Sequence, residues 1–158
     1  MAIAALKLNK TIKPVAEVSD LRSLYNKEIS ESVKYGAVLV TNQDGFDFLD
    51  GEEDLNGRPL LQPWPTDPTK KSYKGMPIEV FDNALLPTVG ESPAAKVPFF
   101  MGNLEMGASF VDDGMYEFAL SEHALFKKNV TLARVIEHVD VIQVDASDKV
   151  YVYGELTV

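Results

Sequence analysis

The chain has 158 residues, of which 46% are hydrophobic and 25% charged, the composition of one globular domain with an apolar core. It contains no cysteine, which excludes disulfides, thiolate metal sites and cysteine nucleophiles. Its formal charge of −9 argues against binding to a nucleic-acid backbone, because no local basic cluster is visible. No apolar run approaches the roughly 20 residues of a membrane span or forms a signal-peptide core, so we expect a soluble chain made inside the cell.

A helix is the first element that the sequence predicts, at residues 19–34. The apolar residues that recur at helical spacing are Leu21, Leu24, Tyr25, Ile29 and Val33. Ser19 is typical of a helix start, and Gly36 is typical of a helix end. Lys27 and Glu31 lie one turn apart, so we expect them to pair on the exposed face.

A strand covered on both faces is predicted at 37–41, where the residues are apolar and mostly branched. Thr41, with Asp44 three residues later, resembles a capping box. A two-turn helix should therefore follow this strand, with Phe46 and Leu49 on its inner face.

The rest of the chain is predicted to be rich in strands and long loops. Prolines interrupt 54–74 and confine any strand there to a sheet edge, so this segment should be a surface loop. Strands are predicted at 78–81, 99–101, 108–111, 115–120, 130–144 and 150–157. The sequence Asp-Asp-Gly at 112–114 is a tight-turn signal that should join the two strands beside it. A turn at 145–148 should join the last two strands into a C-terminal hairpin.

An acidic cluster raises the question of a calcium site, since calcium binds several carboxylate oxygens. Its members are Asp44, Asp47, Asp50, Glu52, Glu53 and Asp54. With Asp50 as the first ligand of an EF-hand loop, Leu55 would replace the turn glycine and Leu61 the bidentate glutamate. We therefore interpret the cluster as a solvated helix end and loop.

The two histidines, His123 and His138, are the candidates for acid–base chemistry. His123 follows Ser121 and Glu122, but adjacency along the chain does not make a catalytic triad. His138 lies in a predicted strand, where a packed or ion-paired role is more typical. The motifs of serine hydrolases, zinc proteases and phosphate-binding loops are absent from the sequence, so we predict no catalytic, cofactor-binding or metal site. A hydrolase that uses either histidine is one alternative.

Trp64 lies between Pro63 and Pro65 in the predicted surface loop. It can be a platform for a ligand, or an apolar anchor that holds the loop or contacts a partner chain. A ligand-binding or adaptor module centred on Trp64 is therefore a second alternative.

The order of the segments resembles the C-terminal half of the major capsid proteins of tailed bacteriophages, which have the Hong Kong 97-like fold. The stretches that carry the resemblance are 37–42, 48–50, 55–61, 73–80, 98–103 and 126–141. They include Asn-Gly-Arg-Pro-Leu-Leu at 56–61 and Gly-Met-Pro-Ile at 75–78. Asn103 stands where aspartate is common in the family, and His138 where arginine is common.

The resemblance implies an α+β fold, in which a central sheet carries a packed N-terminal helix, short helices and long loops. It implies a capsid-like domain at 19–158, formed by the axial domain and part of the peripheral domain, after an N-terminal segment at 1–18. Family members are about twice as long, and their N-terminal arm, extended loop and spine helix are not recognisable in Met1 to Val18. The origin of the chain is left open among three alternatives, which are a truncated prophage gene, an expressed fragment and a protein that reuses the domain.

The resemblance implies a structural function without enzymatic activity or cofactor. The chain would be a subunit or fragment of a tailed-phage or prophage major capsid protein that forms the icosahedral head shell by self-association. Its partners would be other copies in hexamers and pentamers, together with scaffolding or other head proteins. Neither a membrane nor a sequence-specific nucleic acid is expected as a partner. The protein would reside in the virion after synthesis in the host bacterial cytoplasm.

Overall fold

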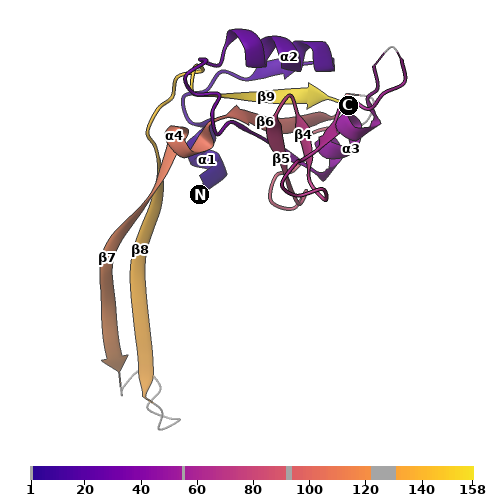
Figure 1. Ribbon diagram of the computed structural model, residues 1–158. Helices are drawn as coiled ribbons and strands as arrows, with labels where there is room; N and C mark the ends of the chain where they lie inside the picture. Colours follow the sequence, from indigo (N-terminus) through magenta and orange to yellow (C-terminus); the bar gives the residue numbers. More distant parts are fainter. Residues whose placement is uncertain (1, 55, 92–93, 122–130) are drawn as a thin grey trace.

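The computed structural model describes residues 2–54, 56–91, 94–121 and 131–158, which form a body and a projecting ribbon (Figure 1). The strands in the sheet of the body are β1 (Lys13–Val15), β2 (Val38–Asn42), β3 (Gln62–Pro63), β4 (Lys71–Tyr73), β5 (Met76–Phe81), β6 (Lys96–Gly102) and β9 (Tyr151–Thr157). Their order across the sheet is β1-β9-β6-β2-β5-β4-β3. The ribbon is a separate two-stranded sheet of β7 (Ala108–Ser121) and β8 (Leu132–Gln143).

Strand β2 lies in the middle of the body's sheet, as an apolar and branched segment should. It runs parallel to β5 and antiparallel to β6, and Leu39 pairs with Ile78 on one side and Met101 on the other. Four of its five residues are buried, which confirms the predicted strand covered on both faces. The strands predicted at 78–81 and 99–101 are confirmed as parts of β5 and β6.

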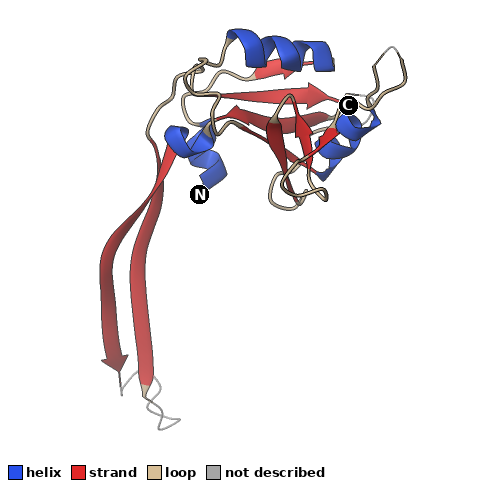
Figure 2. Cartoon of the chain, in the orientation of Figure 1, coloured by secondary structure: helices blue, strands red, loops and turns tan. Residues whose placement is uncertain are grey.

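Helices cover both faces of the body's sheet (Figure 2). The helices in the described residues are α1 (Ala2–Lys7), α2 (Val18–Lys27), α3 (Gln43–Gly51) and α4 (Leu104–Gly107). Leu21 of α2 and Leu49 of α3 belong to the core on one face, whereas Leu6 of α1 and Leu104 of α4 pack against the core on the other. The predicted α+β architecture with a packed helix and a central sheet is confirmed. None of the described helices is long and apolar enough to cross a membrane.

The segment before Ser19, which the sequence left without an assigned structure, contributes α1 and β1. Strand β1 lies parallel to β9, and Val15 pairs with Leu156 in the core. Gly154 permits this close approach, since a Cβ there would lie 2.5 Å from the carbonyl oxygen of Lys13. The sheet therefore extends into the first 18 residues.

Helix α2 ends at Lys27 and is therefore shorter than the helix predicted at residues 19–34. Ile29 is buried as expected, but it lies beyond the helix. The amide of Ser30 donates to the carbonyl oxygen of Lys149 at 2.9 Å, a long-range bond that the spacing of apolar residues does not reveal. The predicted ion pair of Lys27 and Glu31 is not formed, and Glu31 pairs with Lys34 instead. The N-cap residue is Glu17 rather than Ser19.

Helix α3 is confirmed, but its cap lies one residue later than predicted. Asn42 is the N-cap, and its side-chain oxygen accepts a hydrogen bond from the amide of Gly45 at 2.9 Å. The hydroxyl of Thr41 instead donates across the sheet to the carbonyl oxygen of Pro98, because β2 continues through residue 42. Leu49 is buried and Phe46 packs against the core, as predicted.

Both predicted hairpins in the second half are wrong. The Asp-Asp-Gly sequence at 112–114 forms an irregularity within the continuous strand β7, because β8 offers an unbroken partner on both sides of it. The last strand, β9, does not pair with β8. It lies between β1 and β6, where seven residue pairs with β6 hold it in the body's sheet.

Candidate assembly surfaces

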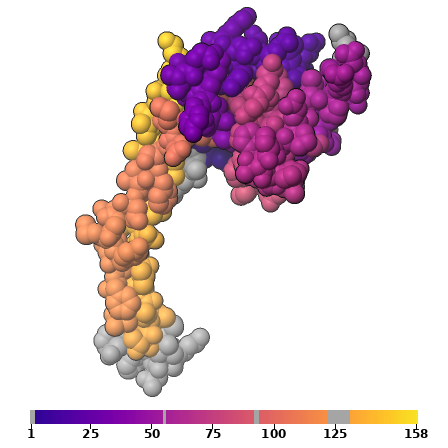
Figure 3. All heavy atoms as spheres, in the orientation of Figure 1, coloured from indigo at the N-terminus to yellow at the C-terminus, as the bar shows by residue number. Residues whose placement is uncertain are grey.

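The ribbon of β7 and β8 extends away from the body as a narrow arm (Figures 1 and 3). Eleven residue pairs hold its two strands together. Of the 14 residues of β7, 12 are exposed, and none is buried. In the described part of the chain, no helix covers the arm as helices cover the body (Figure 2).

One face of the ribbon is apolar along most of its length. Directly opposed residues share a face of a sheet, and the pairs Phe118 with Val135 and Phe110 with Val141 define this face. Between Asp112 and Tyr116, three residues of β7 lie opposite one residue of β8, so β7 has two extra residues there. Because successive side chains of a strand alternate between the two faces, two extra residues leave the following side chains on the same face as before. The apolar residues of this face, which we call the apolar face, are Phe110, Tyr116, Phe118, Leu120, Ala133, Val135, Val139 and Val141. Asp112 and Glu137 share the face beside the irregularity and interrupt it there.

The large side chains of the apolar face are open to solvent. Those that are 62–66% exposed are Phe110, Tyr116, Phe118, Leu120 and Val135. Contiguous exposed apolar surface of this kind marks a site of contact with another macromolecule. Aromatic residues also dominate the energetics of protein interfaces. The apolar face is therefore the candidate assembly surface of the chain.

The opposite face of the ribbon mixes charged and apolar residues, including Glu117, Arg134 and His138. A shallow hollow at the irregularity has a volume of about 750 Å³. Its lining residues are Val111, Asp112, Asp113, Glu137, His138, Val139 and Asp140. His138 is exposed rather than packed or ion-paired as predicted, since no strand or helix of the described chain covers it.

The described residues do not arrange a catalytic group around His138. It makes no hydrogen bond there with a carboxylate or a hydroxyl, and proton transfer requires such reach. His123, the other predicted candidate, lies outside the described residues. Within the described ranges, no group of three acidic, histidine or cysteine side chains is placed to hold a metal ion.

A cleft of about 820 Å³ opens on the body near the start of α2. Its lining residues are Ala16, Glu17, Val18, Ser19, Arg22, Phe48, Glu52, Glu53, Asp54, Leu60, Gln62, Tyr73 and Lys74. The lining combines apolar groups with charges of both signs. The hydroxyl of Tyr73 donates to the carbonyl oxygen of Val18, and burial raises the pKa of Tyr73. Trp64 is half-buried and lies outside this lining, so the structure does not place it as a platform in the cleft.

The acidic cluster that the sequence singled out is divided among separate contacts. Hydrogen bonds from Thr88 and Asn83 hold the pKa of Asp44 below its usual value of 3.8. Asp50 pairs with Lys71, and Asp54 accepts bonds from two backbone amides of its own loop. These three carboxylates therefore make contacts with different parts of the body, in α3 and in the loop that follows it.

Sequence reasoning found the strands of the ribbon but missed that they stand free. The alternation of side chains between the two faces at 132–143 was visible, yet it equally suits a strand that covers a core.

Asn103 has a second role that reasoning from neighbouring residues missed. Its side chain caps α4 by accepting from Met106 N–H and also donates to the carbonyl oxygen of Tyr35, which an aspartate could not do.

Comparisons with known proteins agree with the fold. The model of the phage capsid family matches residues 2–151. Among solved structures, the chain is similar to one described as the capsid of an empty GTA particle computed with C5 symmetry, with a TM-score of 0.61 and 12% identity. The likeness covers 94% of this chain and 51% of that one, so this chain spans about half the length of that capsid chain. The search of curated proteins gave no match.

The family match begins at residue 2 and therefore includes α1 and β1, which precede the stretch that carried the resemblance in the sequence. At 12% identity, the likeness to the solved capsid shows the fold. The family model itself spans nearly the whole chain. From this match and the shared fold, the chain belongs to the phage capsid family.

Proposed function

We propose that the chain is a structural subunit, or a fragment of one, of the head shell of a tailed phage or prophage, and that it acts by self-association. The observation that carries this proposal is the uncovered apolar face of the ribbon. A two-stranded ribbon alone is at best marginally stable in water, whereas a third covering element stabilises it. The family match supports a protein shell as the source of that cover.

The interface chemistry supports protein rather than nucleic acid as the main partner. The ribbon presents aromatic and branched side chains, and the chain carries a formal charge of −9. Such a surface repels phosphate and releases water when it meets another apolar surface. We propose that copies meet head to tail around hexamer and pentamer axes, since such contacts form closed rings. Scaffolding or other head proteins are further partners in this proposal, and the virion is its location.

We propose no enzymatic activity and no cofactor for this chain. The family match supports a structural role. The exposed position of His138 without a hydrogen-bonded carboxylate supports the same reading.

The test is the mass of the chain in solution over a concentration series, by sedimentation velocity. We expect the mass to rise with concentration in the unmodified chain. Phe118→Lys should reduce this association, because it places a charge on the apolar face. Glu117→Lys is the matched control, since it introduces the same residue at the adjacent position on the other face.

Two outcomes would count against the proposal. A chain that stays monomeric at every concentration would contradict self-association by this polypeptide. Equal loss of association in both lysine variants would contradict the assignment of the contact to the apolar face and would indicate a general effect of charge.

A further inference from the structure

The ribbon joins the body through a narrow junction. Strand β7 begins at Ala108, directly after α4 ends at Gly107, and β8 ends at Gln143. The carbonyl oxygen of Gly107 accepts hydrogen bonds from the amides of Val144 at 2.9 Å and Asp145 at 3.3 Å. An arm attached by so few bonds can change its direction about a few backbone torsions unless other contacts hold it.

Tyr151, the first residue of β9, contacts the two chain segments that join the ribbon to the body, at Gly107 directly before β7 and at Gln143 at the end of β8. Its ring lies against Gly107 so closely that a Cβ on Gly107 would be 2.4 Å from two ring carbons. Its hydroxyl accepts a hydrogen bond from Nε2 of Gln143 at 2.6 Å and donates one to the carbonyl oxygen of Leu6 at 3.0 Å. Tyr151 is fully buried, so this arrangement is held within the packed interior.

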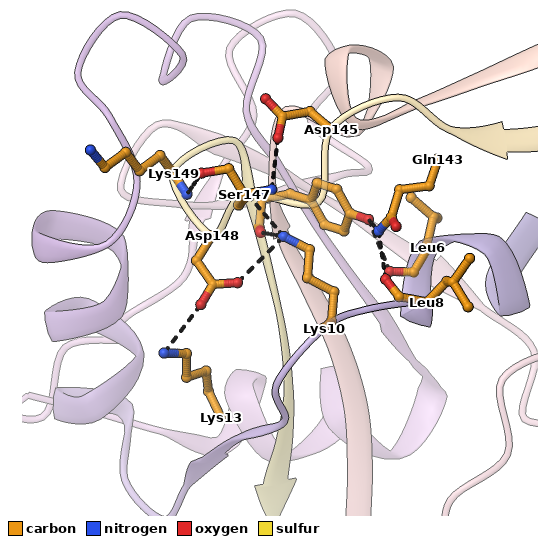
Figure 4. A network of polar contacts seen from close by, with 10 residues as sticks. Leu6, Leu8, Lys10, Lys13, Gln143, Asp145, Ser147, Asp148 and Lys149 are labelled. Atoms are coloured by element: carbon orange, nitrogen blue, oxygen red, sulfur yellow. Dashed lines mark hydrogen bonds and ion pairs between the residues drawn. The ribbon is translucent and has the colours of Figure 1, made fainter.

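The N-terminal segment also contacts the end of β8, and Leu6 and Leu8 lie beside Gln143 (Figure 4). The carbonyl oxygen of Leu8 accepts a second hydrogen bond from Nε2 of Gln143, at 2.7 Å. Leu8 therefore contacts the end of β8, and Leu6 contacts Tyr151 of β9. The segment thus connects the ribbon to a tyrosine that is itself fixed in the body's sheet.

Lys10 connects the N-terminal segment to the body through its side-chain contacts. Its side chain is fully buried, and its Nζ donates to the carbonyl oxygens of Tyr151 at 2.6 Å and Ser147 at 2.8 Å. The Nζ also lies 3.8 Å from the centre of the Tyr151 ring and 3.4 Å from a carboxylate oxygen of Asp148. Burial lowers the pKa of Lys10, although Asp148 opposes this shift. A buried ammonium needs all of these partners, so they fix its position.

We propose that the segment from Leu6 to Lys10 is a brace that fixes the direction of the ribbon relative to the body, with Tyr151 as the point where brace, ribbon and sheet meet. The brace determines the angle at which the apolar face of the ribbon is presented. When the contacts of Lys10 and Gln143 are removed, the ribbon samples a wider range of directions about the junction at Gly107. This inference goes beyond self-association, because it concerns the isolated chain.

The test is the distance between the body and the ribbon, measured with two spin labels by double electron–electron resonance. The chain contains no cysteine, so Asp47→Cys on α3 and Glu117→Cys on β7 can be labelled without other changes. Both positions are exposed. We expect a single narrow distance distribution in the otherwise unmodified chain, and a broader, shifted distribution after Lys10→Met.

Lys13→Met is the matched control. Its ammonium pairs with Asp148 at 3.2 Å, and among the described residues it has no side-chain contact with Tyr151 or the ribbon. The control therefore removes a nearby lysine of β1 that also pairs with Asp148, and it leaves the brace in place. We expect its distance distribution to match that of the unmodified chain. Dilute samples keep the chain monomeric, so a failure of self-association does not affect this reading.

Gln143→Ala provides a second variant in case Lys10→Met does not fold, since it removes the contacts from the ribbon's side and leaves the core of the body intact. Hydrogen exchange of the Val144 and Asp145 amides is a second measurement, and it should be faster in either brace variant than after Lys13→Met. A broad distribution in the unmodified chain would overturn the proposal. So would distributions and exchange rates in the folded brace variants that equal those of the control.

Discussion

Strands β6 and β7 are both rich in apolar residues, yet one is buried and the other is not. In β6, six of seven residues are buried between the helices on the two faces of the sheet. In β7, a similar density of aromatic and branched residues lies open to solvent. The difference shows that the hydrophobicity of a strand does not determine what covers it. In the body the cover belongs to the same chain, whereas the apolar face of the ribbon is available to another one.

The largest effect should come from shortening one phenylalanine in each region. Phe99 is fully buried, so Phe99→Ala should lower the free energy of unfolding of the body by about 3–5 kcal/mol, through lost burial and a cavity. Phe118 is 64% exposed, so Phe118→Ala should change it by less than about 0.5 kcal/mol. Chemical denaturation of dilute samples measures both values. Similar losses in the two variants would contradict the contrast between body and ribbon.

Replacing a glycine by alanine should change the stability of the body at the junction but not in the outer ribbon. Gly107→Ala forces the Tyr151 ring to move and should cost about 1–3 kcal/mol in unfolding free energy. Gly114 has a φ of 66° and no atom within 4 Å of an added Cβ, so Gly114→Ala should strain the ribbon locally by about 1 kcal/mol. Thermal unfolding of the body should therefore shift only for Gly107→Ala. A shift of equal size for Gly114→Ala would show that ribbon and body unfold together.

Removing a side-chain cap should also have different effects in the two regions. Asn42→Ala removes the cap of α3 and the bonds to Leu86 and Thr88, and it should lower the unfolding free energy by about 1–2 kcal/mol. Asp112→Ala removes the corresponding bond to the Gly114 amide in the ribbon and should leave the body unchanged. Denaturant titration followed by far-ultraviolet circular dichroism compares the two variants. If Asp112→Ala destabilised the body as much as Asn42→Ala, the separation of the regions would fail.

The smallest effect should be the pH dependence of a contact in the body. The pKa of Asp44 is lowered in the folded chain, so its contribution to stability is present above the unfolded value of 3.8 and is lost as pH falls through the folded value. Asp44→Asn should therefore be less stable than the unmodified chain at neutral pH, and the difference should shrink in acid. Asp47→Asn, on the same exposed helix surface, is the control. A difference that did not depend on pH would contradict the role of the ionised carboxylate.

The sequence by itself determined the elements whose signals are local. The branched run that forms β2 and the inner-face residues Phe46 and Leu49 of α3 were predicted, because apolar spacing and flanking residues act within one or two turns. The interpretation of the acidic cluster as a helix end and loop also came from spacing alone. The family resemblance added the fold class, which no single motif supports.

Only the tertiary structure decided where these elements end and what they pair with. Helix α2 ends at Lys27, and just beyond its end the amide of Ser30 bonds to the carbonyl oxygen of Lys149, more than a hundred positions away in the sequence. The turn signal at 112–114 became an irregularity because eleven pairs with β8 outweigh the preference of three residues. Likewise, β9 joined β6 rather than β8, and the ribbon was left uncovered. Local preferences are worth a few tenths to about one kcal/mol each, whereas pairing and burial sum over a whole strand, so the long-range partner prevails.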